Sequence, residues 1–100
     1  MKQTPLKKRP VCDLQTVLKT PQGRRVLWRI LQAAQVRQHG FVPGDAYATA
    51  FHCGQRSIGL FLLEEIEQAH AGAYQQMRSE YQAEVISAQQ QFIQQENENV

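Results

Sequence analysis

The sequence contains few of the residues on which disulfide-bonded domains and metal sites depend. It has only two cysteines, Cys12 and Cys53, which make no disulfide framework, so we expect a reducing, intracellular setting. The three histidines do not pair with the cysteines at the spacings of structural zinc sites. Adjacent His52 and Cys53 would point about 100° apart on a helix, which suits neither a shared ion nor an activated thiol. We therefore expect no metal, no other cofactor and no nucleophilic catalysis.

Long apolar runs are also absent. The longest, Ile58 to Leu63, is about a third of the roughly 20 residues that span a bilayer, so we expect no membrane span. The basic N-terminus is followed by Pro10 and Asp13 instead of an apolar stretch, which is not typical of a secretory signal. A chain of 100 residues forms one small domain with little core, so a large substrate cleft and an enzymatic role are not expected.

Charge is divided unevenly along the chain. Residues 1–40 contain nine basic residues and one acidic residue, whereas residues 41–100 contain two basic and eight acidic residues. The formal net charge of +2 hides this asymmetry. The pattern indicates either a basic surface for a polyanion or two halves that attract each other within or between subunits.

Hydropathy spacing predicts an all-α fold, and strand signals are nearly absent. We expect a small helical bundle of three main helices plus a short N-terminal helix, with a long amphipathic C-terminal helix. Along the chain, we expect a basic flexible arm over residues 1–12, a single helical domain over residues 13–94 and a polar C-terminal tail over residues 95–100.

The Thr20–Pro21 step separates the first two predicted helices. The short first helix starts at Asp13 and ends at this Thr20–Pro21 step, because the residue before a proline avoids the α region. Thr20 then serves as N-cap of a second helix that runs to about Gln38 and has Pro21 at its first position. One arc of this helix is apolar and the opposite arc is basic. The apolar arc consists of Val26, Leu27, Ile30, Leu31 and Ala34.

The third helix is expected from its N-cap, Asp45, to about Gln68, and its stripe of apolar residues predicts the central, most buried element. Because glycine costs about 1 kcal/mol relative to alanine inside a helix, Gly54 and Gly59 predict a close crossing with another backbone. The stripe consists of Tyr47, Ala50, Phe51, Gly54, Ile58, Phe61 and Leu62.

The fourth predicted helix has the firmest periodicity in the chain. A helix from Ala73 to Gln94 would be about 33 Å long, and we expect its far end to overhang the core and bind a partner. Trp28, at the edge of the second helix's polar arc, either covers the first helix or is an interface anchor flanked by arginine. The predicted partner-binding residues are Tyr74, Met77, Tyr81, Val85, Ala88, Phe92 and Trp28.

A polyanion is the other candidate partner. The start of the second helix combines free backbone N–H groups with Arg24 and Arg25, an arrangement that holds phosphates or carboxylates. The connection from Gln38 to Gly44 is long for a helix-turn-helix, so contact with DNA is expected to be non-specific. The predicted nucleic-acid or anion contacts are Lys7, Lys8, Arg9, Arg24, Arg25 and Arg29.

Several stretches resemble a family of small tailed-bacteriophage proteins of the Bordetella-phage type. They are residues 13–27, residues 51–60, and residues 74–77 with Glu80. The first stretch includes TPQGRRVL, and the second includes most of the GQRSIGLFL segment, which spans residues 54–62. The resemblance covers roughly residues 13–81 and implies a protein encoded among virion structural genes, with no enzymatic role. The chain departs from the family at residues 71–73, where Ala-Gly-Ala replaces the usual proline ahead of Tyr74.

These patterns predict a non-enzymatic bacteriophage structural or virion-associated protein that acts through helix-mediated assembly. The expected partners are phage structural proteins of portal, core or tail type, or further copies of this chain, and the expected location is the virion or the host cytoplasm. The alternative is a small phage DNA-binding or regulatory protein that uses the basic arm and the second helix.

Overall fold

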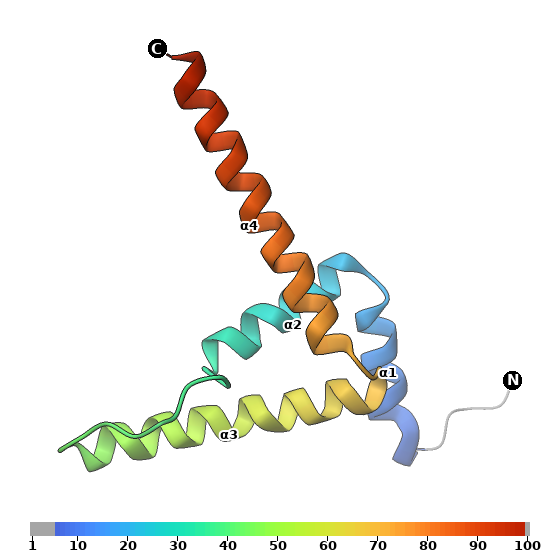
Figure 1. Ribbon diagram of the computed structural model, residues 1–100. Helices are drawn as coiled ribbons and strands as arrows, with labels where there is room; N and C mark the ends of the chain where they lie inside the picture. Colours follow the sequence, from blue (N-terminus) through green and yellow to red (C-terminus); the bar gives the residue numbers. More distant parts are fainter. Residues whose placement is uncertain (1–5, 100) are drawn as a thin grey trace, which may run out of the picture.

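The computed structural model describes residues 6–99. This part of the chain forms a 3-10 turn followed by four helices and contains no strand, so the predicted all-α fold is confirmed (Figure 1). The elements are η1 (Leu6–Lys8), α1 (Arg9–Leu18), α2 (Pro21–Ala33), α3 (Ala46–Ala69) and α4 (Ala73–Glu98).

Two predicted helix ends are wrong. The first helix begins at Arg9 and not at Asp13, because Pro10 falls in its first turn, where the missing N–H is not needed. The last helix continues beyond Gln94 to Glu98, so most of the predicted polar tail is helical. Residues 1–5 of the predicted arm, and residue 100, lie outside the described residues.

The short first helix and the three main helices of the predicted fold are present, and they form an open arrangement. In Figure 1, α3 and α4 diverge from a common corner beside α1, and α2 lies in the angle between them. The Cα radius of gyration is 18.2 Å, whereas about 13 Å is typical of a compact domain of this length. The molecule measures 61 × 52 × 16 Å along its principal axes, so it is flat and open. The N-terminal half of α3 and the C-terminal half of α4 therefore project from a small core.

The core occupies the region where the four helices meet. Leu31 of α2 and Ile66 of α3 have no exposed surface and lie at its centre. Among residues 6–99 no polar or charged residue is buried, and burial of hydrophobic side chains supplies most of the folding free energy. The cluster consists of Leu18, Leu27, Trp28, Leu31, Ala34, Val36, Ile66, Ala69, Ala73, Tyr74 and Met77.

The N-terminus of α2 is capped as predicted. The Thr20 hydroxyl accepts a hydrogen bond of 3.0 Å from the Gly23 N–H, and Pro21 occupies the first helical position. Asp45 caps α3 in the same way, because its carboxylate accepts from the Ala48 N–H at 2.9 Å. Local sequence signals are sufficient for these two helix starts.

The C-terminus of α2 is not where the sequence predicts it. The helix ends at Ala33 instead of Gln38, and Gln35 adopts a left-handed conformation with φ of 55°. The side chain of Gln55, on α3, donates a 2.6 Å hydrogen bond to the Ala33 carbonyl and so satisfies an acceptor that a longer helix would have used. This early turn directs Val36 into the core, where it is 4% exposed.

One of the two predicted glycine contacts is confirmed. A Cβ at Gly59 would collide with the Val36 side chain and the Ala34 Cβ, so the absence of a side chain lets the end of α2 rest on α3. The prediction for Gly54 is wrong, since no heavy atom lies within 4 Å of the equivalent position there.

The turn between α3 and α4 sets the direction of α4. Gly72 adopts a left-handed φ of 85°, a conformation that glycine tolerates without steric cost. The Glu67 carboxylate accepts hydrogen bonds from the N–H groups of Gly72 (2.8 Å) and Tyr74 (2.9 Å), and therefore caps α4 from the preceding helix. Gly72 and Glu67 thus fix this turn.

Candidate partner-binding surface

Most of the apolar stripe of α3 that the sequence predicts as core faces away from the rest of the protein; Leu62, its last member, is partly buried and packs against the core. Tyr47 is 91% exposed, and Phe51, Ile58 and Phe61 are each at least 60% exposed. The prediction that α3 is the central, most buried element is therefore wrong. We call these four residues and Gly54 the α3 stripe; the first and last members are about 21 Å apart along the helix axis.

The rotation of α3 about its axis explains this exposure. The residues of α3 that are buried are Gly59, Ile66 and Ala69. Since neighbouring residues on a helix point about 100° apart, the contact of Gly59 with α2 turns Ile58 away from the core. The close packing that Gly59 allows thus orients the middle of α3, whereas Ala69, on the same face as Ile58 but three turns further along, is covered where α1 packs on the end of α3.

The apolar seam of α4 is divided into a buried part and an exposed part. Tyr74 and Met77 belong to the core, with exposures of 8% and 2%, whereas Phe92 is 60% exposed. Beyond Tyr81 no residue of the described chain encloses the seam, and a shallow hollow of about 500 Å³ lies along it. We define the distal seam as Tyr81, Val85, Ala88 and Phe92.

Trp28 lies in the core at the base of the distal seam. Its ring is 9% exposed and packs against the rings of Tyr74 and Tyr81, with centroid separations of 5.5 Å in both cases. The indole Nε1 is buried and has no hydrogen-bond partner within the chain. Trp28 therefore joins α2 to α4, and most of its surface is covered by its own chain.

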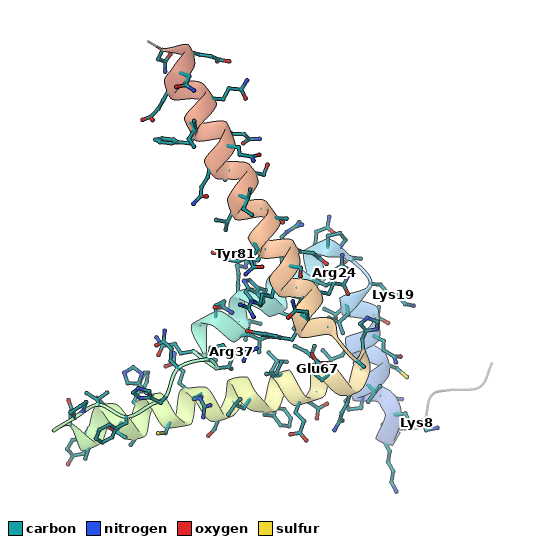
Figure 2. All side chains as sticks on the ribbon, viewed as in Figure 1. Lys8, Lys19, Arg24, Arg37, Glu67 and Tyr81 are labelled. Atoms are coloured by element: carbon teal, nitrogen blue, oxygen red, sulfur yellow. The ribbon has the colours of Figure 1, made fainter. Side chains whose placement is uncertain are left out.

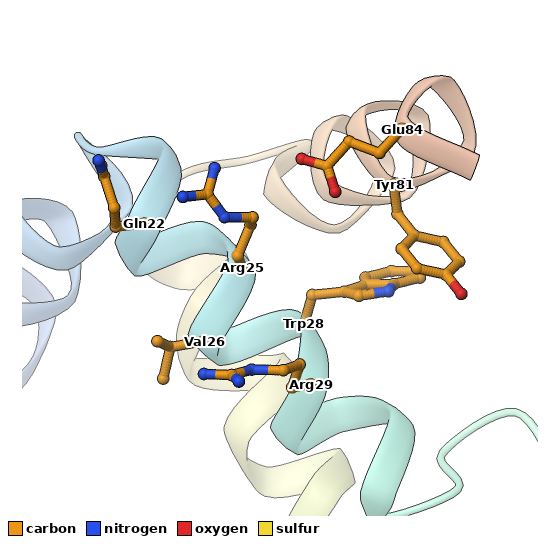
Figure 3. A pocket seen from close by; sticks show the side chains of 7 residues that line it. All are labelled: Gln22, Arg25, Val26, Trp28, Arg29, Tyr81 and Glu84. Atoms are coloured by element: carbon orange, nitrogen blue, oxygen red, sulfur yellow. The ribbon is translucent and has the colours of Figure 1, made fainter. Parts of the chain in front are cut away.

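A hollow of about 380 Å³ separates α2 from α4 beside this tryptophan (Figure 3). Trp28 and Tyr81 form its apolar wall. The exposed side chains of Arg25 and Arg29 and the carboxylate of Glu84 surround it, with Glu84 across from Arg25. The structure thus brings two predicted anion contacts beside two predicted partner-binding aromatics. Gln22 and Val26 complete the lining.

Arg24 is not free to bind an anion. Its guanidinium lies 2.8 Å from the Glu80 carboxylate and also donates a 2.8 Å hydrogen bond to the Leu18 carbonyl. This is the one salt bridge in the part of the chain that the structure describes, and it makes Arg24 a link between α1, α2 and α4.

The other predicted cationic contacts do not form one surface. Lys7, Lys8 and Arg9 are exposed on η1 and at the start of α1. Figure 2 shows Lys8 at the opposite end of α1 from Arg24. The structure therefore separates these three residues from the Arg25 and Arg29 pair.

Two kinds of site are absent from the described residues. Within residues 6–99, no group of three or more histidine, cysteine, aspartate or glutamate side chains is arranged to hold a metal ion. No helix in this range combines the length with the apolar character that crossing a membrane requires.

Comparison with known protein families identifies the family of this chain. A model of the Bbp19-like phage proteins matches residues 14–79, which is more than half of the 100 residues. The chain belongs to the Bbp19-like phage proteins. The predicted membership of a Bordetella-phage-type family is thereby confirmed. No significant match was found among curated proteins or among solved structures.

The family match covers the two candidate surfaces differently. It includes all of α3 in this Bbp19-like protein, and with it the α3 stripe, whereas the distal seam lies beyond residue 79. The sequence analysis identified the apolar residues of both surfaces but assigned the α3 stripe to the core. Hydropathy spacing alone could not reveal the error, because it gives the same signal for a covered face and an exposed one.

Proposed function

We propose that this Bbp19-like protein is a non-enzymatic, virion-associated structural protein, which acts by binding other proteins of the phage particle through its exposed apolar helix surfaces. The observation that carries the proposal is the α3 stripe. Contiguous exposed apolar surface of this kind marks interaction sites in soluble proteins. The family supplies the biological setting, since its description names a phage protein and no reaction.

The α3 stripe has the features of a site for a partner helix. Buried aromatic side chains cover 150–250 Å² each, so burial of Phe51 and Phe61 with Ile58 would supply a large share of an interface. The open space at Gly54, midway along the stripe, allows another backbone to come close at that point. An apolar face of a helix from a portal, core or tail protein would fit this surface.

The shape of the molecule supports the same function. An isolated helix is marginally stable in water, and most helical stability in proteins comes from packing of one face. Residues beyond Tyr81 in α4 are all exposed, so their helix lacks such packing in the monomer. A partner along this helix would supply it.

Mass spectrometry of purified phage particles tests the proposal. A structural component remains with the particle at a constant copy number through purification, and we expect this result. Detection of the protein in infected cells but not in purified particles would contradict a permanent structural role. Removal of loosely bound protein by a salt wash is the control for contamination.

The alternative function is DNA binding or regulation. Its support is the exposure of Arg25 and Arg29 on α2 and of Lys8 on η1. The Arg24–Glu80 ion pair weakens it by removing one predicted contact. A gel-shift titration of the purified protein separates the two functions: sequence-selective binding that survives moderate salt would favour regulation, whereas weak binding lost at moderate salt would favour the structural role.

A further inference from the structure

The distal seam continues a surface that is already used inside the protein. Tyr74 and Met77 face α2, and the same stripe of α4 goes on through Val85, Ala88 and Phe92 with nothing from its own chain over it. The spacing of three and four residues is the pattern of helices that pack side by side. The occupant of the distal seam should therefore be another helix.

The charges around the distal seam indicate which helix would occupy it. Beyond Arg78 the helix has no basic residue, and its charged groups are Glu80, which is paired with Arg24, and Glu84, Glu96 and Glu98. Beside the start of the distal seam, the hollow between α2 and α4 carries two guanidiniums, Arg25 and Arg29, against one carboxylate, Glu84. An acidic, apolar helix therefore complements this hollow, and the C-terminal half of α4 itself has that character.

An antiparallel pair of α4 helices brings these parts together. If two copies pair about Ala88, Phe92 of one copy lies beside Val85 of the second copy. Glu96 of one copy then lies at the level of Glu80 and Tyr81 of the second copy; Glu80 is already paired with Arg24, and Tyr81 lines the hollow with Arg25 and Arg29. The positive end of the α2 dipole lies at the same place and adds to the attraction.

We infer that the distal seam binds the distal seam of a second copy of this chain, in an antiparallel and two-fold symmetric dimer with Glu96 and Glu98 of each copy beside Arg25 and Arg29 of the other. In a two-fold symmetric dimer each favourable contact occurs twice. A parallel pair would instead place like carboxylates side by side with no cation between them. The inference deepens the proposed function and rests on its premise that the exposed helix surfaces bind protein; it leaves the α3 stripe for the particle partner.

Reciprocal charge reversal in the purified full-length chain tests the dimer. We expect light scattering after size-exclusion chromatography to give twice the 11.5 kDa mass of the chain. The double variants Arg25→Glu/Arg29→Glu and Glu96→Lys/Glu98→Lys should each raise the dissociation constant by about ten-fold or more at low salt, because each places like charges together. An equimolar mixture of the two variants should restore dimerisation, since every contact in the mixed dimer is again attractive.

Apolar variants provide a second test that does not depend on charge. Phe92→Ser removes the central contact of the distal seam and should give a monomer. The matched control is Ile86→Ser, which changes an equally exposed aliphatic residue on another face of α4 and should leave the dimer intact. Circular dichroism at equal concentration checks that both variants remain helical.

Several outcomes would overturn the inference: a wild-type chain that is monomeric up to about 1 mM, a dimer that Phe92→Ser leaves unchanged, or two charge variants that do not rescue each other. These results are independent of particle composition. A monomeric protein found at constant copy number in virions would contradict the dimer and support the proposed function. A dimer that is missing from virions would support the dimer and contradict the proposed function.

Discussion

The Arg24 guanidinium contacts the Glu80 carboxylate at 2.8 Å where α4 leaves the core, and the same guanidinium donates to the Leu18 carbonyl at the end of α1. The two side chains are 15% and 33% exposed, so the ion pair is partly shielded from water. A single arginine therefore holds three helices in the angle that lets α4 project. The stability of this corner should depend on that ion pair.

Loss of the ion pair is expected to destabilise the fold measurably. Glu80→Gln should lower the free energy of unfolding by about 1 kcal/mol, because the pair is only partly buried. Arg24→Ala should cost about 2 kcal/mol, since it also leaves the Glu80 carboxylate and the Leu18 carbonyl without their donor. Urea denaturation followed by circular dichroism measures both. Glu84→Gln, at an exposed position, is the control, and equal effects at positions 80 and 84 would contradict the assigned role.

The two glycines of α3 should respond to alanine in opposite directions. Gly54→Ala should raise the free energy of unfolding by up to about 1 kcal/mol, because the new methyl group meets open space and alanine favours the helix. Gly59→Ala should lower it by about 1 kcal/mol or more, because the methyl group meets Val36 and Ala34. Thermal or urea unfolding of the pair gives the signs directly. A gain in stability at both positions would show that α2 does not rest on Gly59.

Substitution of Trp28 separates its packing from its N–H group. Trp28→Phe keeps an aromatic ring against Tyr74 and Tyr81 and removes a buried donor that has no partner in the chain, so the change in stability should stay within about 1 kcal/mol. Trp28→Ala empties the site and should cost about 3–5 kcal/mol. Urea denaturation compares the two. If phenylalanine were as damaging as alanine, the indole N–H would have to be hydrogen-bonded in solution.

Local signals in the sequence are enough to predict the helices and two of their starts. Thr20 and Asp45 are N-cap residues with β-region backbone, and both accept the hydrogen bond that capping requires. The end of α2 could not be predicted in this way. It depends on Gln55, which lies 22 residues after the carbonyl that it satisfies and comes into reach only when α3 has docked.

The orientation of α3 was likewise beyond hydropathy analysis. The stripe from Tyr47 to Phe61 is the more apolar face, but Gly59 and Ile66 lie on the face that the rest of the chain covers. A glycine contact that brings two backbones together can decide packing against a more apolar alternative. The overhang of α4 was predictable, because this helix was expected to be longer than the second helix beside it, and it has 26 residues against 13.

In the proposed function, the α3 stripe attaches the protein to another protein of the particle. Its most direct test is the copy number, measured by quantitative mass spectrometry, in particles that carry Phe51→Ser/Ile58→Ser. We expect this variant to fold and to be lost from the particle. The control is Ile30→Ser, which changes an exposed residue outside both surfaces and should be retained at the wild-type level. Incorporation of the stripe variant at the wild-type copy number would contradict the account.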